Sequence, residues 1–72
     1  MKTKSRTEAK KLAKAYSYNK EYADVPVYII YCNRSEKYYV DTNSLIQSWE
    51  RLIGYCINGV FTPEKQNNNI KK

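Results

Sequence analysis

The strongest pattern of hydrophobic and polar positions lies between residues 41 and 59. If this stretch is a helix with about 100° per residue, its apolar side chains share an arc about 140° wide and most polar ones lie opposite. The apolar positions are Leu45, Ile46, Trp49, Leu52, Ile53, Cys56 and Ile57. Asp41 to Asn43 suit an N-cap, and Asn58-Gly59 suits a helix end. The pattern predicts a core helix over residues 42–58, with Gly54 on its solvent side.

A second helical pattern begins near the amino terminus. Ser5 and Glu8 have the spacing of a capping box, in which each side chain satisfies a free backbone N–H at the start of a helix. An apolar stripe follows at spacings of three and four: Ala9, Leu12, Ala13 and Tyr16. Two members are alanine, so we expect this helix to bury little area, to dock through Leu12 and Tyr16, and to lose definition around residues 19–24.

Residues 25–32 and 37–40 predict a β-hairpin, because both runs are rich in β-branched and aromatic residues. Alternation places Val27, Ile29 and Tyr31 on one face of the first strand and Tyr28, Ile30 and Cys32 on the other. Both faces are apolar, and the predicted core helix covers only one of them. Residues 60–62 either add a short third strand or place Phe61 on the core.

The predicted fold class is therefore a small α+β domain, ordered helix, β-hairpin, helix, with a short C-terminal third strand as an option. Residues 1–63 form the single domain, 1–4 are its flexible basic start, and 64–72 are a disordered tail. The hairpin contributes to the core through Val27, Ile29, Tyr31 and Val40. A chain of 72 residues buries only about 60% of the surface exposed on unfolding, so we expect added support from a partner subunit.

Cysteine and histidine usage limits the chemistry. Cys32 and Cys56 are the two cysteines and histidine is absent, so one chain cannot supply a typical zinc ligand set, and we expect no metal and no cofactor. The amino terminus lacks the apolar segment of a signal peptide, which predicts a reduced, cytoplasmic protein with free thiols and no membrane partner. A Cys32–Cys56 disulfide is the less favoured alternative. The sequence contains no Gly-rich phosphate loop and no nucleophile with a histidine base, so we expect no enzyme.

The net charge of +6 is concentrated at the amino terminus. Residues 1–20 carry seven basic side chains against Glu8 alone, whereas residues 21–63 carry three against five acids. Lysines neutralise phosphates and an exposed tyrosine can stack on a base, so the first helix is the best candidate for binding a polyanion. The candidate residues are Arg6, Lys10, Lys11, Lys14 and Tyr18. A lysine-rich face that is merely solvated is the alternative.

Tyrosine is unusually frequent, with eight in 72 residues. It gives a large contact area with few rotors to immobilise, which favours protein interfaces. A lone hairpin is only marginally stable, and its edge strands carry unpaired backbone groups. We therefore predict a homodimer or larger symmetric assembly through Tyr28, Ile30 and Tyr39.

Two function classes fit these observations. The first is a non-catalytic binding protein whose basic helix engages nucleic acid or a nucleotide. The second is an interaction protein of phage or mobile-element origin, acting as an inhibitor or accessory factor by binding a host protein. Only the small size and the composition rich in lysine, asparagine and isoleucine suggest that origin.

Overall fold

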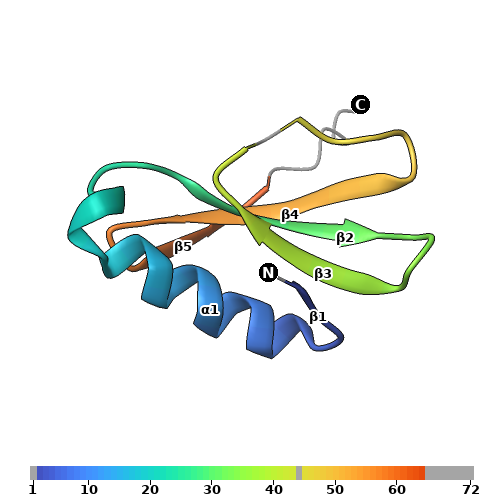
Figure 1. The fold of residues 1–72 in the computed structure, drawn as a ribbon, viewed down its shortest axis with the longest axis horizontal. Helices are drawn as coiled ribbons and strands as arrows, with labels where there is room; N and C mark the ends of the chain where they lie inside the picture. The colour runs from blue at the N-terminus through green and yellow to red at the C-terminus, as the bar shows by residue number, and fades with distance from the viewer. Residues whose placement is uncertain (1, 44, 65–72) are drawn as a thin grey trace, which may run out of the picture.

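One α-helix packs on one face of a five-stranded antiparallel sheet (Figure 1). The computed structural model describes residues 2–43 and 45–64. The strand order across the sheet is β1-β3-β2-β4-β5. In chain order the elements are β1 (Lys2–Thr3), α1 (Arg6–Tyr18), the 3₁₀ turn η1 (Lys20–Tyr22), β2 (Val27–Cys32), β3 (Lys37–Asp41), β4 (Glu50–Ile57) and β5 (Val60–Pro63).

Helix α1 begins where the capping pattern predicts. The Ser5 hydroxyl accepts a hydrogen bond of 3.2 Å from the Glu8 N–H, which satisfies one free donor of the first turn. Ala9, Ala13 and Ser17 are buried against the sheet, and Leu12 and Tyr16 pack around them. The predicted docking through Leu12 and Tyr16 is confirmed, and the positions that α1 buries most fully are the small residues Ala9, Ala13 and Ser17.

The predicted hairpin is confirmed as β2 and β3, joined by residues 33–36. Its turn is closed by a 2.8 Å hydrogen bond from the Glu36 N–H to the Cys32 carbonyl. Strand β2 lies at the centre of the sheet with a neighbour on each edge. Both of its faces are apolar because both are buried: α1 covers Val27 and Ile29 on one face, and Ile30 and Cys32 on the other are 5% and 4% exposed.

The predicted helix over residues 42–58 was wrong, and with it the fold class of helix, hairpin, helix. Residues 50–57 form β4, which pairs with β2, and β5 returns beside β4. Asn58 and Gly59 form the turn between them, with φ angles of 51° and 85°. These are the left-handed values of a primed two-residue hairpin turn, so Asn58-Gly59 marks a hairpin and not a helix end.

Residues 42–49 connect β3 to β4 without regular structure in the part that is described. Both strands are antiparallel to β2, so they are parallel to each other, and the connection must cross the sheet. It passes on the side opposite α1 (Figure 1). Leu45 and Ile46 are 83% and 40% exposed in this connection, so their assignment to the core was wrong, and Trp49 is only half-buried.

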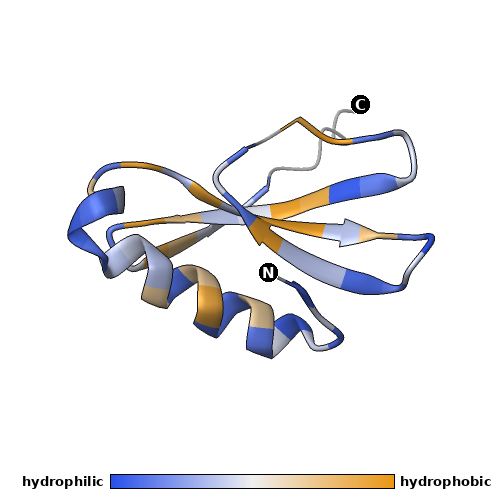
Figure 2. Ribbon diagram, in the orientation of Figure 1, coloured by the Kyte–Doolittle hydropathy of each residue, from blue (hydrophilic) through white to orange (hydrophobic). Residues whose placement is uncertain are grey.

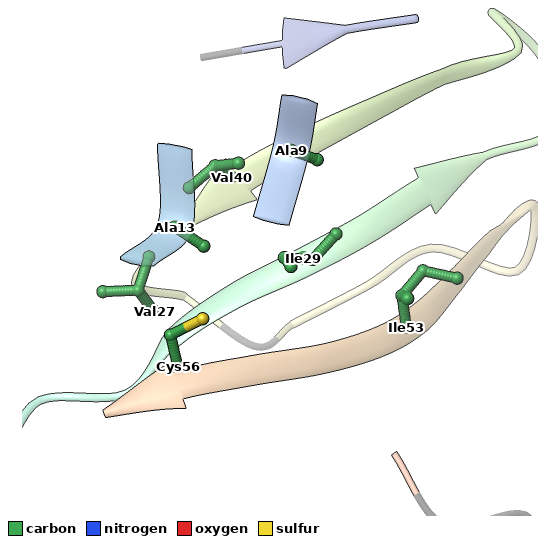
Figure 3. Close-up of a cluster of buried hydrophobic side chains, with 7 residues drawn as sticks. All are labelled: Ala9, Ala13, Val27, Ile29, Val40, Ile53 and Cys56. Atoms are coloured by element: carbon green, nitrogen blue, oxygen red, sulfur yellow. The ribbon is translucent and has the colours of Figure 1, made fainter. Parts of the chain in front are cut away.

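The core lies between α1 and the sheet (Figure 3). Ala9 and Ala13 of α1 pack against side chains from the three central strands, which are Val27, Ile29, Val40, Ile53 and Cys56. The pairing of β2 with β4 shifts register between Ile29 and Ile30. Ile29 pairs with Gly54 and Ile30 with Leu52, so Ile53 is the extra residue of a bulge and joins the core.

Polar and apolar positions are interspersed along α1, and hydrophobic positions are concentrated in β2 and β4, whereas β3 is mostly hydrophilic (Figure 2). Within the described ranges, the structure has no helix with the length and apolarity required to cross a membrane.

Candidate functional site

Three of the predicted basic residues lie along one flank of α1, beside β5. Arg6, Lys10 and Lys14 are four residues apart, so each lies about 6 Å along the helix from the last and is turned by about 40°. We call these three residues the basic stripe. Tyr18 continues the line by one more turn and is 73% exposed. The structure therefore brings four of the five predicted residues into one row.

Lys11 lies beside this row and not in it. It precedes Lys14 by one turn and points outward from the sheet, where it is exposed. Lys11 therefore adds positive charge near the basic stripe from outside the row.

Contacts with the β4–β5 hairpin hold the basic stripe in place. The Lys10 ammonium lies 4.6 Å from the centre of the Phe61 ring in β5, a cation–π geometry. The Tyr18 ring occupies the space that a β-carbon on Gly59 would need. The Gly59 N–H also donates a 2.8 Å hydrogen bond to the Ser17 hydroxyl. The middle and the carboxyl-terminal end of this flank are therefore held against the β4–β5 hairpin.

Hydrogen bonds between Asp24 and Asn58 stabilise the same end of the β4–β5 hairpin. The Asp24 N–H and the Asn58 side-chain oxygen form a 3.1 Å hydrogen bond, and the Asn58 amide donates to the Asp24 carboxylate at 2.8 Å. Asp24 and Asn58 both have positive φ, and each side chain satisfies the other's polar groups. The segment after η1 is thereby tied to the β4–β5 turn.

Arg51 extends the positive surface from the helix onto the sheet. It pairs with Tyr31 across β2 and β4, so it lies on the face of the sheet that α1 covers. Arg6 and Arg51 line one shallow hollow, together with Pro63 and the acidic Glu64. The basic stripe thus continues into β4 at the amino-terminal end of the helix.

A group of aromatic and guanidinium side chains lies at the end of the sheet near the 33–36 turn. The Tyr31 and Tyr38 rings are 4.9 Å apart with an angle of 54° between their planes, and the Arg51 guanidinium lies 6.0 Å from the Tyr31 ring. The Arg34 guanidinium stacks 3.6 Å over the Trp49 ring. We call these five residues the aromatic ledge.

Sequence reasoning missed the aromatic ledge. Its members come from β2, the following turn, β3 and the start of β4, and only strand pairing places them together. The frequency of tyrosine in the hairpin was the available signal, and it was assigned to an oligomer interface.

The three residues predicted for that interface lie on the sheet face opposite α1, by alternation from the buried Val27 and Val40. Ile30 is only 5% exposed within a single chain, so it has little surface left for a partner. Tyr28 and Tyr39 are half-buried. The centres of the Tyr28 and Tyr55 rings are 6.1 Å apart, and the Tyr39 hydroxyl lies 3.5 Å from the Ser35 hydroxyl. Assembly through this face remains a prediction.

The sheet places the two free cysteines on opposite faces. Cys56 pairs with Val27 and joins the core under α1, whereas Cys32 lies five residues beyond Val27 and points to the other side. A disulfide between them is excluded by this geometry. Hydrogen bonds from the Ser35 hydroxyl and the Ser35 N–H lower the pKa of the Cys32 thiol, and burial raises the pKa of Cys56.

We expect iodoacetamide to alkylate Cys32 at lower pH than Cys56. The thiolate is the reactive form, and a lowered pKa makes it available at lower pH. The replacement Ser35→Ala should move the pH profile of Cys32 to higher pH, while Ser48→Ala, an exposed control, should leave it unchanged. Peptide mass spectrometry after timed alkylation measures both sites, and faster labelling of Cys56 would contradict the assignment.

In the described part of the chain, no three potential metal ligands among His, Cys, Asp and Glu come together. Comparisons with protein-family models, with curated proteins and with solved structures found no match. The geometry of the basic stripe and the aromatic ledge is therefore the basis for a functional proposal.

Proposed function

We propose that this protein is a non-catalytic nucleic-acid-binding protein that holds the phosphate backbone along the basic stripe. The observation that carries the proposal is the row of Arg6, Lys10 and Lys14, which continues into Arg51 on the sheet. Cations spaced one helical turn apart on a fixed flank suit a ligand with repeated negative charges. A small anion would use only one or two of them.

The charge distribution supports this choice of ligand. Residues 1–20 have a local charge of +6, and the central part of the chain is mildly acidic. A polyanion is therefore attracted to α1 and not to the sheet face on the other side. Binding of this kind releases counterions from the nucleic acid and weakens as salt rises.

Charge reversal on the basic stripe tests the proposal. The variant Arg6→Glu/Lys14→Glu changes two exposed residues and leaves the Lys10 contact with Phe61 in place. We expect binding of a fluorescein-labelled oligonucleotide to weaken by at least about tenfold, and the slope of log K against log salt to fall by about 1 to 2. Fluorescence anisotropy at several salt concentrations measures both values.

The matched control is Lys2→Glu/Lys20→Glu. It changes the formal net charge by the same amount, at exposed positions in β1 and η1. We expect a much smaller loss of affinity, because these residues are off the stripe. Equal losses in the two variants would mean that net charge alone attracts the ligand, and this outcome would overturn the proposed site.

The second function class, an interaction protein that binds a host protein, makes a different experimental prediction. A stoichiometric complex whose affinity hardly changes with salt would support it. Light scattering of the purified protein, combined with its ultraviolet absorbance ratio, reports the oligomeric state and any co-purified nucleic acid together.

A further inference from the structure

The aromatic ledge carries planar groups of the type that stack on nucleobases. From this arrangement we infer that the ledge binds unpaired bases, so that the preferred ligand is single-stranded nucleic acid. The inference rests on the proposed function, because the basic stripe supplies the phosphate contacts. The ledge adds a second site with a distinct chemical role, and Arg51 is the one residue that it shares with the phosphate-binding row.

Strand register builds one half of the ledge. Tyr31 pairs with Tyr38 on β3 and with Arg51 on β4. The three side chains therefore stand in a row across neighbouring strands, on the face of the sheet that carries α1. The two tyrosines pack at the margin of the core and are half-buried. Burial on one side holds the rings in position, and their remaining surface is accessible to a base.

The other half of the ledge is the stack of Arg34 on Trp49. The 33–36 turn and the residue before β4 are joined by a 2.9 Å hydrogen bond from the Asn33 N–H to the Trp49 carbonyl. The exposed Arg34 guanidinium lies 3.6 Å over the indole ring. A guanidinium is planar and stacks on aromatic rings. Arg34 thus covers one surface of the indole and presents its own outer plane for a base.

The ledge and the stripe meet at one point. Arg51 belongs to the ledge through its position beside Tyr31, and it shares a hollow with Arg6 of the stripe. A strand whose phosphates follow Lys14, Lys10 and Arg6 is therefore led to the ledge. Cationic groups that track the backbone and aromatic groups that stack on bases are the two elements of single-strand recognition.

The bases of a duplex cannot stack on the aromatic ledge. Their bases are stacked on one another, so only phosphates, sugars and groove edges reach the protein. Unpaired bases are free to stack on aromatic rings or on arginine planes. The basic stripe alone would bind both forms, and the ledge accounts for a preference for the single strand.

Trp49 reports on the ledge directly, because it is the only tryptophan in the chain. The probes are oligodeoxyuridylate, oligouridylate and a mixed-sequence duplex, each about 15 nucleotides long. We expect both single strands to quench Trp49 fluorescence and to bind about tenfold more tightly than the duplex at the same salt concentration. The ratio between the two single strands identifies whether the 2′-hydroxyl contributes.

Charge-conserving variants separate stacking from phosphate binding. Arg34→Lys/Arg51→Lys keeps both positive charges and removes both guanidinium planes. We expect the single-strand preference to fall clearly below tenfold without being lost, because the aromatic rings of Tyr31, Tyr38 and Trp49 remain, and we expect the quenching to decrease with the salt slope retained. The control Lys20→Arg, which lies outside both surfaces, should leave all three readouts unchanged. Circular dichroism checks that each variant is folded.

The outcomes separate the inference from the proposed function. Salt-dependent binding that is equal for single strands and duplex, with unchanged Trp49 fluorescence, overturns the inference and leaves the proposed function standing. A single-strand preference that survives Arg34→Lys/Arg51→Lys in full also overturns the role of the ledge. Absence of salt-dependent binding to every probe overturns both.

Discussion

Replacing Ile29 with alanine is expected to lower the free energy of unfolding by about 2 to 5 kcal/mol. Ile29 is fully buried in the central strand of the sheet and packs in the core beneath α1. The smaller side chain loses hydrophobic transfer energy and leaves a cavity that the paired strands cannot close. A domain of this size has a total stability of roughly 4 to 11 kcal/mol, so this change removes a large share of it. Urea unfolding followed by circular dichroism measures the effect.

Leu45→Ala is the matched comparison for Ile29→Ala. Leu45 was predicted to lie in a core helix, and the structure leaves it 83% exposed in the connection between β3 and β4. We therefore expect its truncation to change stability by less than about 0.5 kcal/mol. A loss at Leu45 as large as that at Ile29 would contradict the observed core.

Gly54→Ala is expected to destabilise the protein by about 1 to 3 kcal/mol. A β-carbon on Gly54 would lie 2.6 Å from the Thr62 carbonyl oxygen and 2.8 Å from two atoms of the Phe61 ring. The Phe61 ring packs against the core, and the Thr62 carbonyl belongs to the neighbouring strand and must move with its backbone. Chemical denaturation of the two proteins under the same conditions measures the difference.

The sign of the Gly54→Ala effect distinguishes the two assignments of residues 50–57. On the solvent side of a helix, alanine would be favoured over glycine by about 1 kcal/mol. The double variant Gly54→Ala/Phe61→Leu serves as a control, because the smaller side chain removes the ring contact. The loss of stability in the double variant should be smaller than the sum of the losses in the two single variants. A Gly54→Ala protein that is more stable than the parent would contradict the assignment of residues 50–57 to a strand.

The error in the second half of the chain has a physical cause. In residues 50–57, Leu52, Ile53, Cys56 and Ile57 match the helical spacings of three and four. The same residues in β4 face both sides of the sheet, and the bulge at Ile53 interrupts their alternation. A strand that is apolar on both faces gives no clean period of two, so periodicity alone does not separate it from a helix.

The two parts of the candidate site differ in how far the sequence reveals them. The basic stripe is encoded at a spacing of four within one helix, so its residues could be named before the fold was known. Tyr31 and Arg51 are neighbours only because β2 pairs with β4, and Arg34 meets Trp49 only because the 33–36 turn lies beside the start of β4. Contacts of this kind require the register of strands that are distant in sequence.

By itself, the sequence determined the local elements of this protein: the helix that starts after Ser5, the β2–β3 hairpin and the concentration of positive charge on α1. Each depends on interactions between residues a few positions apart. The tertiary structure alone decided that residues 50–63 form two strands, that α1 is the element covering the core, and that an aromatic ledge adjoins the basic stripe. The physical reason is that the central strand β2 must pair on both edges and be covered on its faces. The adjacent strand β3 supplies one edge locally, whereas the other edge and the covered face require β4 and α1, which are more distant in sequence.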